Sequence, residues 1–309
     1  MYLRLGGKEP NFLQLSYIDD RKEANRVICE MLERTDPCMV ARFGSNELTA
    51  ITNYLGVMNP QRSYWKYIKN EVLEWWWSPE IVYHMQSNAG FFPSNEETLT
   101  RYAELCLEDA QEVDVLGSWQ KREYYLNPFM VNLKHKVRLR YLEPYFFSDD
   151  ASKEWTQLLR GKNVLVIHPF VDTIRKQYAK RQLLFKDPNL LPEFNLLTLK
   201  AVQSIGGDNA EFATWFDALD WMKHEIDKIN FDIAIIGCGA YGFNLAAYIK
   251  RKGKKAIHLG GATQLLFGIK GRRWEENEDY HGLYNENWCR PSENERPMTA
   301  SKVENGCYW

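Results

Sequence analysis

The stretch FDIAIIGCGAYGFNLAAYIKRKGKKAIHLGG, residues 231–261, decides the fold. It predicts a short apolar strand over 232–236, a glycine-rich turn, a helix over 243–252 that ends at Gly253, and a second apolar strand over 255–259. Strands that are apolar at nearly every position are typical of parallel sheets, in which helices cover both faces. The stretch therefore predicts one unit of a parallel α/β protein.

The same alternation of apolar strands and amphipathic helices extends along most of the chain. Further strands are expected over 38–41, 114–117, 137–142, 163–167 and 194–199. Helices are expected over 21–33, 46–56, 70–77, 94–110, 150–159, 172–181, 212–229 and 262–269. The order of these elements predicts an α/β fold with a Rossmann-like, mostly parallel sheet and helices on both faces.

The chain is expected to form one α/β domain over residues 1–274, which could include an N-terminal helical extension over 1–36. From Glu275 onward the sequence is polar and lacks periodicity. Residues 275–309 are therefore expected to form an irregular tail packed on the domain and anchored by Trp288, Tyr308 and Trp309.

Composition excludes several classes of protein. The 309 residues include 39 Lys+Arg and 41 Asp+Glu, a net charge of −2, which excludes a general basic nucleic-acid binder and provides no polybasic tail for a membrane surface. No window approaches about 18 apolar residues, and no signal peptide is evident, so we expect no membrane span and a cytoplasmic location. The six cysteines include no C-x-x-C pair, which argues against a zinc knuckle.

A G-x-G-x-x-G motif follows the strand over 232–236 and opens a helix, as in dinucleotide-binding turns. Its candidate ligand-binding residues are Gly237, Gly239, Ala240, Tyr241 and Gly242. An NAD site requires an acid after the next strand, yet the nearest following acid is Glu275. A nucleotide diphosphate is therefore favoured over NAD, with a simple tight turn as the alternative. We expect Gly239→Val to weaken nucleotide binding and to leave the fold largely intact.

Two more strand-to-helix turns carry candidate ligand-binding residues. The first contributes Gly260, Gly261, Gln264, Lys270, Arg272 and Arg273, and its cations suit a diphosphate leaving group. A basic helix end that faces solvent explains these cations equally well. The second turn, 41–47, contributes Arg42, Gly44, Ser45, Asn46 and Glu47, of which Ser45 or Asn46 could simply cap a helix. Because Arg42 closes an apolar strand, we expect it to be partly buried and to require an anionic partner.

The segment Arg42-Phe43-Gly44-Ser45-Asn46-Glu47 resembles the R-x-G-D-G-E segment of GT-D-type glycosyltransferases, and the likeness covers most of residues 20–309. The resemblance implies a Rossmann-like fold and transfer of a sugar from a nucleotide sugar. In that family a D-x-E pair holds a divalent metal, and here Ser45 replaces the Asp and leaves Glu47. We therefore expect no tightly bound metal, although Mg²⁺ or Mn²⁺ could bind together with the donor through Glu47.

On this basis the expected activity is glycosyl transfer from a nucleotide-diphosphate sugar to a saccharide or glycolipid acceptor, in surface polysaccharide or glycoconjugate synthesis. Arg42, Lys270, Arg272 and Arg273 would neutralise the diphosphate, and Glu47 or His168 would accept the acceptor proton. Trp119, which follows a strand, could stack on a base or a sugar, although a core role is the stronger expectation. The alternative is a non-catalytic protein that binds a nucleotide or a nucleotide sugar. We expect neither a nucleic-acid partner nor a particular oligomeric state.

Overall fold

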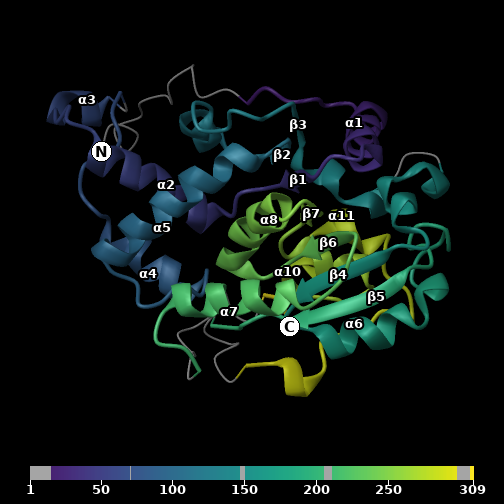
Figure 1. Ribbon diagram of the computed structural model, residues 1–309. Helices are drawn as coiled ribbons and strands as arrows, with labels where there is room; N and C mark the ends of the chain where they lie inside the picture. The colour runs from purple at the N-terminus through teal and green to yellow at the C-terminus, as the bar shows by residue number, and fades with distance from the viewer. Residues whose placement is uncertain (1–14, 70, 147–149, 205–210, 298–306) are drawn as a thin grey trace.

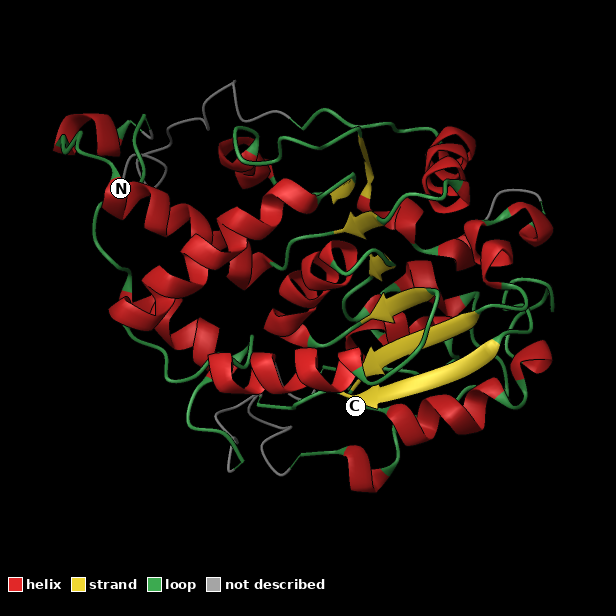
Figure 2. Ribbon diagram, viewed as in Figure 1, coloured by secondary structure: helices red, strands yellow, loops and turns green. Residues whose placement is uncertain are grey.

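The computed structural model describes residues 15–69, 71–146, 150–204, 211–297 and 307–309 (Figure 1). Within these residues seven strands form one sheet in the order β3-β2-β1-β7-β6-β4-β5, and every pair is parallel (Figure 2). The strands are β1 Cys38–Ala41, β2 Val115–Ser118, β3 His135–Arg138, β4 Asn163–His168, β5 Asn195–Lys200, β6 Ile233–Ile236 and β7 Lys255–His258. The predicted Rossmann-like α/β fold is thus confirmed.

Helices cover both faces of this sheet. The α-helices of the described residues are α1 Arg21–Glu33, α2 Ser45–Met58, α3 Tyr64–Ile68, α4 Pro79–Ser87, α5 Glu96–Asp109, α6 Val171–Tyr178, α7 Trp215–Asp227, α8 Gly242–Arg251, α9 Ala262–Leu266, α10 Arg272–Glu275 and α11 Glu278–His281. Among them, α3 contributes no residue to either core. Met39 and Ala41 pack with α2, α5, α7 and α8 on one face, whereas Cys38 and Val40 pack with α1, α6 and α9 on the other. Alternate residues of a strand thus enter two separate cores.

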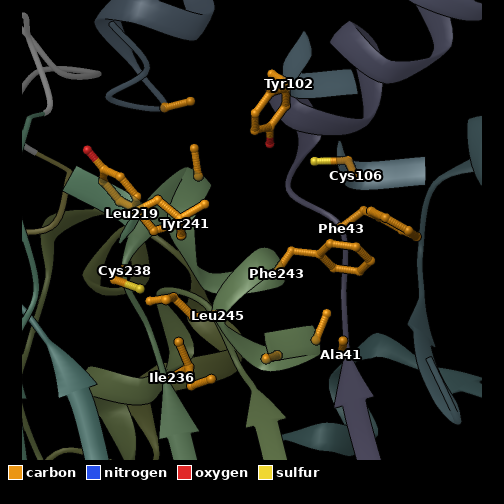
Figure 3. Close-up of a cluster of buried hydrophobic side chains, with 14 of the residues drawn as sticks. Ala41, Phe43, Tyr102, Cys106, Leu219, Ile236, Cys238, Tyr241, Phe243 and Leu245 are labelled. Atoms are coloured by element: carbon orange, nitrogen blue, oxygen red, sulfur yellow. The ribbon is translucent and has the colours of Figure 1, made fainter. Parts of the chain in front are cut away.

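Figure 3 shows the core on the first face. The ring centroids of Phe43 and Phe243 are 4.5 Å apart above Ala41, so the turn after β1 packs directly on α8. Nearby, Tyr241 stacks on the buried Trp215 at 5.0 Å with an interplanar angle of 8°. These aromatic contacts fix the two strand-to-helix turns relative to each other.

Three expected elements differ from the structure. No helix occupies 70–77 in the described residues, because the buried Asn53 side chain donates to the carbonyls of Glu74 and Trp76 and accepts from the amide of Ser78. These bonds hold the backbone between α3 and α4 in a non-helical path. Residues 150–159 form two short 3₁₀ turns, Ala151–Lys153 and Trp155–Leu159. The strand expected over 137–142 lies at His135–Arg138.

One expected helix begins at a different cap. The helix expected from Ser94 is α5, in which Asn95 caps the first turn and Thr98 reaches back to the Asn95 amide. Asn and Ser are both good caps, and here the Ser94 hydroxyl instead donates to the carbonyl of Val82 at 2.7 Å, which leaves Asn95 to accept from the Thr98 amide. The sequence thus predicted the helix and missed its first residue.

Register aligns the ends of the central strands. Ile236 pairs with both Ile167 and His258, while Ala41 pairs with Leu116. The residues that follow β1, β2, β4, β6 and β7 therefore meet at one edge of the sheet. In open α/β sheets this carboxyl edge is where ligands bind.

The segment after residue 275 packs on the second face, where Trp288 and Trp309 join the core. Its buried Glu295 accepts hydrogen bonds from the amides of Asp172, at 2.7 Å, and Thr173, which fixes the first turn of α6. Residues 1–14 of the expected N-terminal extension and residues 298–306 of the tail lie outside the described residues. The rest of the extension includes α1, which packs on the sheet.

The helices that the structure describes include none with the length and apolar character needed to span a bilayer.

The buried ion pair at Asp114 yields a stability prediction. Its carboxylate accepts from the Met39 amide at 2.9 Å and lies 2.8 Å from Lys250 and 3.0 Å from Lys134, which ties β1, β2 and α8 together. We expect Asp114→Ala to lower the free energy of unfolding in urea by about 3 kcal/mol, because Lys250 loses its buried counter-charge. Asp220→Ala removes the exposed pair with Lys223 and should cost at most about 0.5 kcal/mol. Equal effects of the two substitutions would contradict this account.

Candidate functional site

A cavity of about 1040 Å³, a volume that includes part of its open mouth, lies at the carboxyl edge. The turns after β1, β2, β4, β6 and β7 line it, as the register requires. Of the residues singled out in the sequence, the cavity is lined by Arg42, Gly44, Ser45, Asn46, Glu47, Trp119, His168, Gly237, Gly239, Tyr241, Gly260, Gly261, Gln264 and Arg273. Segments far apart in the sequence thus converge on one cavity.

The structure does not bring four of the candidates into the lining of this cavity: Ala240, Gly242, Lys270 and Arg272. The Lys270 ammonium lies 5.4 Å above the ring of Tyr284, and Arg272 pairs with Glu276 at 2.8 Å on the surface. Of the three cations expected from this segment, Arg273 is therefore the one that reaches the cavity.

Arg42 is held among aromatic and charged groups at the end of β1. Its guanidinium lies 5.1 Å from the ring centroid of Trp119, within the range of a cation–π contact. Burial lowers the pKa of Arg42 from its ordinary value, and the nearby carboxylate of Glu47 opposes this shift. Gly260, at φ +63°, leaves room for the guanidinium, since a Cβ there would lie 3.3 Å from Nη1. The expectation of a partly buried arginine near an anion is met.

Glu47 lies in the first turn of α2 and folds back toward the start of its own helix. A Cβ on Gly44 would collide with the Glu47 carboxylate, so the absence of a side chain at residue 44 lets this carboxylate take its position. The backbone of Gly44, at φ −70°, does not itself require glycine. Gly44 is therefore a positioning residue for Glu47.

Trp119 is placed by a buried carboxylate. Glu123, fully buried, accepts hydrogen bonds from the amides of Trp119 and Gln120, each at 2.9 Å, and from the Ser118 hydroxyl. Burial raises the pKa of Glu123, and these hydrogen bonds oppose the shift. The indole N–H of Trp119 then donates to the carbonyl of Phe43 at 3.1 Å, while 40% of the residue stays exposed. The ring is thus fixed at the cavity and is not a core residue.

The three glycines of the G-x-G-x-x-G motif are required for internal packing. A Cβ on Gly237 would lie 2.5 Å from the Gly260 carbonyl, and one on Gly242 would collide with the His258 ring. Gly239 has φ +57°, and its Cβ would lie 3.2 Å from the Ala89 carbonyl. Gly239→Val should therefore destabilise the turn, because Val strongly disfavours this left-handed backbone, so weaker nucleotide binding in this variant would not by itself assign the turn to a ligand. The tight-turn alternative accounts for the glycines, although their turn still lines the cavity.

His168 lines the cavity but is poorly suited to act as a base. Its Nδ1 accepts a hydrogen bond from the Phe170 amide at 3.0 Å, so in the neutral ring Nε2 carries the proton. Burial lowers the pKa of His168 to about 3. The proton-accepting role predicted for His168 therefore disagrees with this geometry, and the imidazole can instead donate a hydrogen bond.

Several residues of the cavity wall are not predicted by the sequence pattern. Tyr308 and Trp309 were expected only as anchors, yet both line the cavity, and the Tyr308 hydroxyl accepts a hydrogen bond from Arg273 at 3.1 Å. Ser204 follows β5 and bonds with the Tyr241 hydroxyl at 3.0 Å. Because Ser204 follows a predicted strand, its place at the carboxyl edge of the sheet could have been predicted. No local sequence pattern predicts that Tyr308 contacts this edge.

The residues at the cavity do not fit a tightly held divalent metal. Glu47 is the one carboxylate among the described residues that line it, and a serine hydroxyl at residue 45 is a weak ligand for a hard cation. Within the described ranges, no group of three or more His, Cys, Asp or Glu side chains is arranged to hold an ion.

The all-parallel sheet with helices on both faces defines a Rossmann-like α/β protein, and its cavity lies over the strand ends. A family model described as a GT-D fold-like domain matches residues 20–266, and the chain therefore belongs to that family. Comparison with curated proteins gives no match.

Two solved structures are similar to this chain. One is a selenomethionine-substituted structure of domain of unknown function 1792, at 12% identity. The other is described as the highly conserved domain of unknown function 1792 with a distinct glycosyltransferase fold, at 13% identity. Each match covers 92% of this chain and 94% of the other, with a TM-score of 0.37. Because this TM-score is low, the fold assignment is based on the sheet topology and the family model.

The buried, neutral His168 predicts a loss of stability in acid. Between the unfolded pKa of about 6.5 and the native pKa of about 3, only the unfolded chain takes up the proton, so the stabilising contribution is complete above pH 6.5 and declines below it. His168→Asn keeps an acceptor for the Phe170 amide. It should reduce the stability difference between pH 7 and pH 5 by about 2 kcal/mol in urea unfolding.

The exposed His224 on α7 provides the control for this experiment, since His224→Asn should leave the pH dependence unchanged. An unaltered pH dependence in His168→Asn would contradict this account, because it would mean that the native imidazole takes up its proton over the same pH range as the unfolded chain.

Proposed function

We propose that this protein is a glycosyltransferase that binds a nucleotide-diphosphate sugar in the carboxyl-edge cavity. Membership of the GT-D fold-like family supports this proposal. The observation that carries it is the convergence of Arg42, Glu47 and Arg273 in one cavity, with the two glycine-rich turns beside them. A diphosphate needs cations, and group transfer to a hydroxyl needs a proton acceptor.

The donor would lie across the strand ends. Arg42 and Arg273 would contact the diphosphate, and the charge that develops on this leaving group would be stabilised by these cations. The exposed face of Trp119 and the ring of Tyr308 offer flat surfaces for a base or a sugar. The cavity is open to solvent on one side, so part of an elongated donor could extend beyond its mouth.

Glu47 is the proposed proton acceptor. In the reaction, the bond between the anomeric carbon and the diphosphate oxygen breaks, a bond to the acceptor oxygen forms, and the acceptor hydroxyl proton passes to the Glu47 carboxylate. His168 would donate a hydrogen bond to the ligand. A divalent ion would enter only with the donor, because the protein itself supplies one carboxylate in the described lining.

A second cavity, of about 580 Å³, adjoins the first and shares Asn46 with it. Carboxylates of Glu74 and Glu80, the imidazole of His84 and the guanidinium of Arg122 line it. Charged donors and acceptors at this density suit a ligand rich in hydroxyl groups. We propose that the acceptor saccharide binds here, and a route in surface polysaccharide or glycoconjugate synthesis would supply such an acceptor.

Ser45 favours a second candidate, a nucleotide-sugar-binding protein without catalytic activity. Ser45 replaces the carboxylate of the family motif and is exposed at the cavity. Both candidates require the donor to bind, and only the first requires turnover.

Thermal unfolding in the presence of nucleotides tests the donor site. We expect the diphosphates of uridine, guanosine or cytidine to stabilise the protein more than NAD does, by about 2.7 kcal/mol at 100 times the dissociation constant. Arg273→Gln should weaken the binding of the best diphosphate by more than about tenfold, since a hydrogen bond to a charged group is lost. Arg272→Gln is the matched control on α10 and should bind normally. Tight NAD binding without diphosphate binding would overturn the donor assignment.

Glu47→Gln tests the proton acceptor. With the nucleotide sugar selected by thermal shift, we expect the rate of nucleoside diphosphate release to fall by at least about 100-fold, because the amide cannot accept the proton. Donor affinity should change little, since a base acts mainly in the transition state. Glu108→Gln, an exposed change on α5, should react like the wild type. Donor binding without turnover in the wild type would instead favour the non-catalytic candidate.

A further inference from the structure

A group of aromatic side chains lies outside both hydrophobic cores. Tyr64, Trp65 and Tyr67 come from α3, and Trp75 and Trp76 from the segment before α4; these five residues are here called the aromatic patch. Tyr64 is 74% exposed, Trp65 76% and Trp76 40%. None of α3 is buried. Figure 1 shows α3 projecting at the top left of the molecule, beyond α2.

The patch is ordered by its own ring contacts. The Trp75 ring lies 5.1 Å from Tyr64, 5.8 Å from Tyr67 and 5.2 Å from Trp76, each with an edge-to-face geometry. By contrast, the adjacent Trp77 is 7% exposed and joins the core. The run of three tryptophans therefore divides into one core residue and two patch residues.

The base of the patch is fixed to α2. Asn53, 2% exposed, bonds to the backbone carbonyls of Glu74 and Trp76 and to the amide of Ser78. A Cβ on Gly56 would collide with the backbone of Glu74, so the two segments are in direct contact. The patch is thus a fixed projection whose outer side remains uncovered by the described chain.

The α3 side of the patch carries exposed cations, whereas two acids lie on the other segment: Glu71 is exposed and Glu74 directly precedes Trp75. Arg62, Lys66 and Lys69 are all exposed, and the sequence from Asn59 to Lys69 contains no acid. This cluster of three cations occurs in a chain whose net charge is −2. The α3 side of the patch is therefore locally basic, although the chain as a whole is nearly neutral.

We propose that the aromatic patch and its three cations bind the interface of an anionic lipid bilayer. Trp and Tyr place an apolar ring and a polar edge together, which suits the headgroup region, and each Lys or Arg near an anionic surface adds attraction. Trp, Tyr and Arg also occur in protein interfaces, but the two lysines, which are depleted there, favour the bilayer. This inference does not depend on the proposed glycosyl transfer.

The second cavity connects this surface to the candidate site. Glu74, which lines that cavity, directly precedes Trp75 of the patch, and Asn46 at the other end lines the main cavity. If the proposed acceptor site is correct, an acceptor carried on a lipid would reach Glu47 along this polar path.

Vesicle co-sedimentation of the full chain tests the bilayer proposal independently of activity. We expect the protein to bind phosphatidylcholine vesicles that contain about one-third phosphatidylglycerol. The double substitution Lys66→Gln/Lys69→Gln should weaken this binding by about fivefold for each of the two lysines removed. Raising NaCl from about 0.1 to about 0.5 M should also weaken binding, since salt screens surface charge. Tyr64→Ser/Trp65→Ser/Trp76→Ser should reduce the bound fraction at least about tenfold, because interfacial burial of these rings is lost.

Two control variants are matched in chemistry and exposure. Trp221→Ser on α7, where Trp221 is 39% exposed, and Lys153→Gln, where the side chain is 80% exposed, should bind vesicles like the wild type. Far-UV circular dichroism and thermal unfolding establish that every variant is folded.

The proposal is overturned if the wild type binds anionic vesicles no better than pure phosphatidylcholine, or if the patch variants retain binding. Concentration-dependent self-association that the aromatic variant abolishes, without vesicle binding, would also overturn it and would assign the patch to a protein contact. Loss of binding in the patch variants together with normal nucleotide binding would support the bilayer proposal even if glycosyl transfer is disproved.

Discussion

The parallel direction of all seven strands, together with burial of the sheet on both faces, constrains everything else in this protein. Helices and apolar side chains occupy both faces, so polar groups for binding have space only beyond the strand ends. The strand register then determines which ends meet. Arg42, His168 and Gly237 come from three different strands and lie around one cavity because their strands end in line.

The apolar periodicity of the sequence predicts the strands and helices whose formation depends on burial of one face. The strands and the helices that pack on them follow from apolar periodicity, since burial of one face stabilises each element. The segment 70–77 has similar periodicity but lies outside both cores apart from its last residue, and Asn53 holds its backbone through long-range hydrogen bonds. Tyr308 reaches the cavity through contacts with Arg273, which no local pattern encodes.

The residue types at the strand ends predicted the location of the candidate site. They were a poorer guide to the role of each residue in it. Glycines at a turn indicate close approach of another atom, but the sequence does not say whether that atom belongs to a ligand or to the protein. Here Gly237 makes room for the Gly260 carbonyl. Likewise, a histidine at a strand end predicts proton transfer only if solvent reaches it, and burial holds His168 in its neutral form. Such differences depend on tertiary distances of a few ångströms.

The carboxylate of Glu295 occupies the first turn of α6, the helix that follows the β4 wall of the cavity. Its hydrogen bonds with the amides of Asp172 and Thr173 fill the positive end of that helix with an anion from the chain itself. The wall at β4 thus presents the neutral imidazole of His168, and the helix end behind it is already occupied, whereas Arg42 and Arg273 supply the cations of the described lining, with Glu47 beside Arg42. An elongated ligand with one anionic end would therefore enter in a single orientation, with its charge directed away from β4.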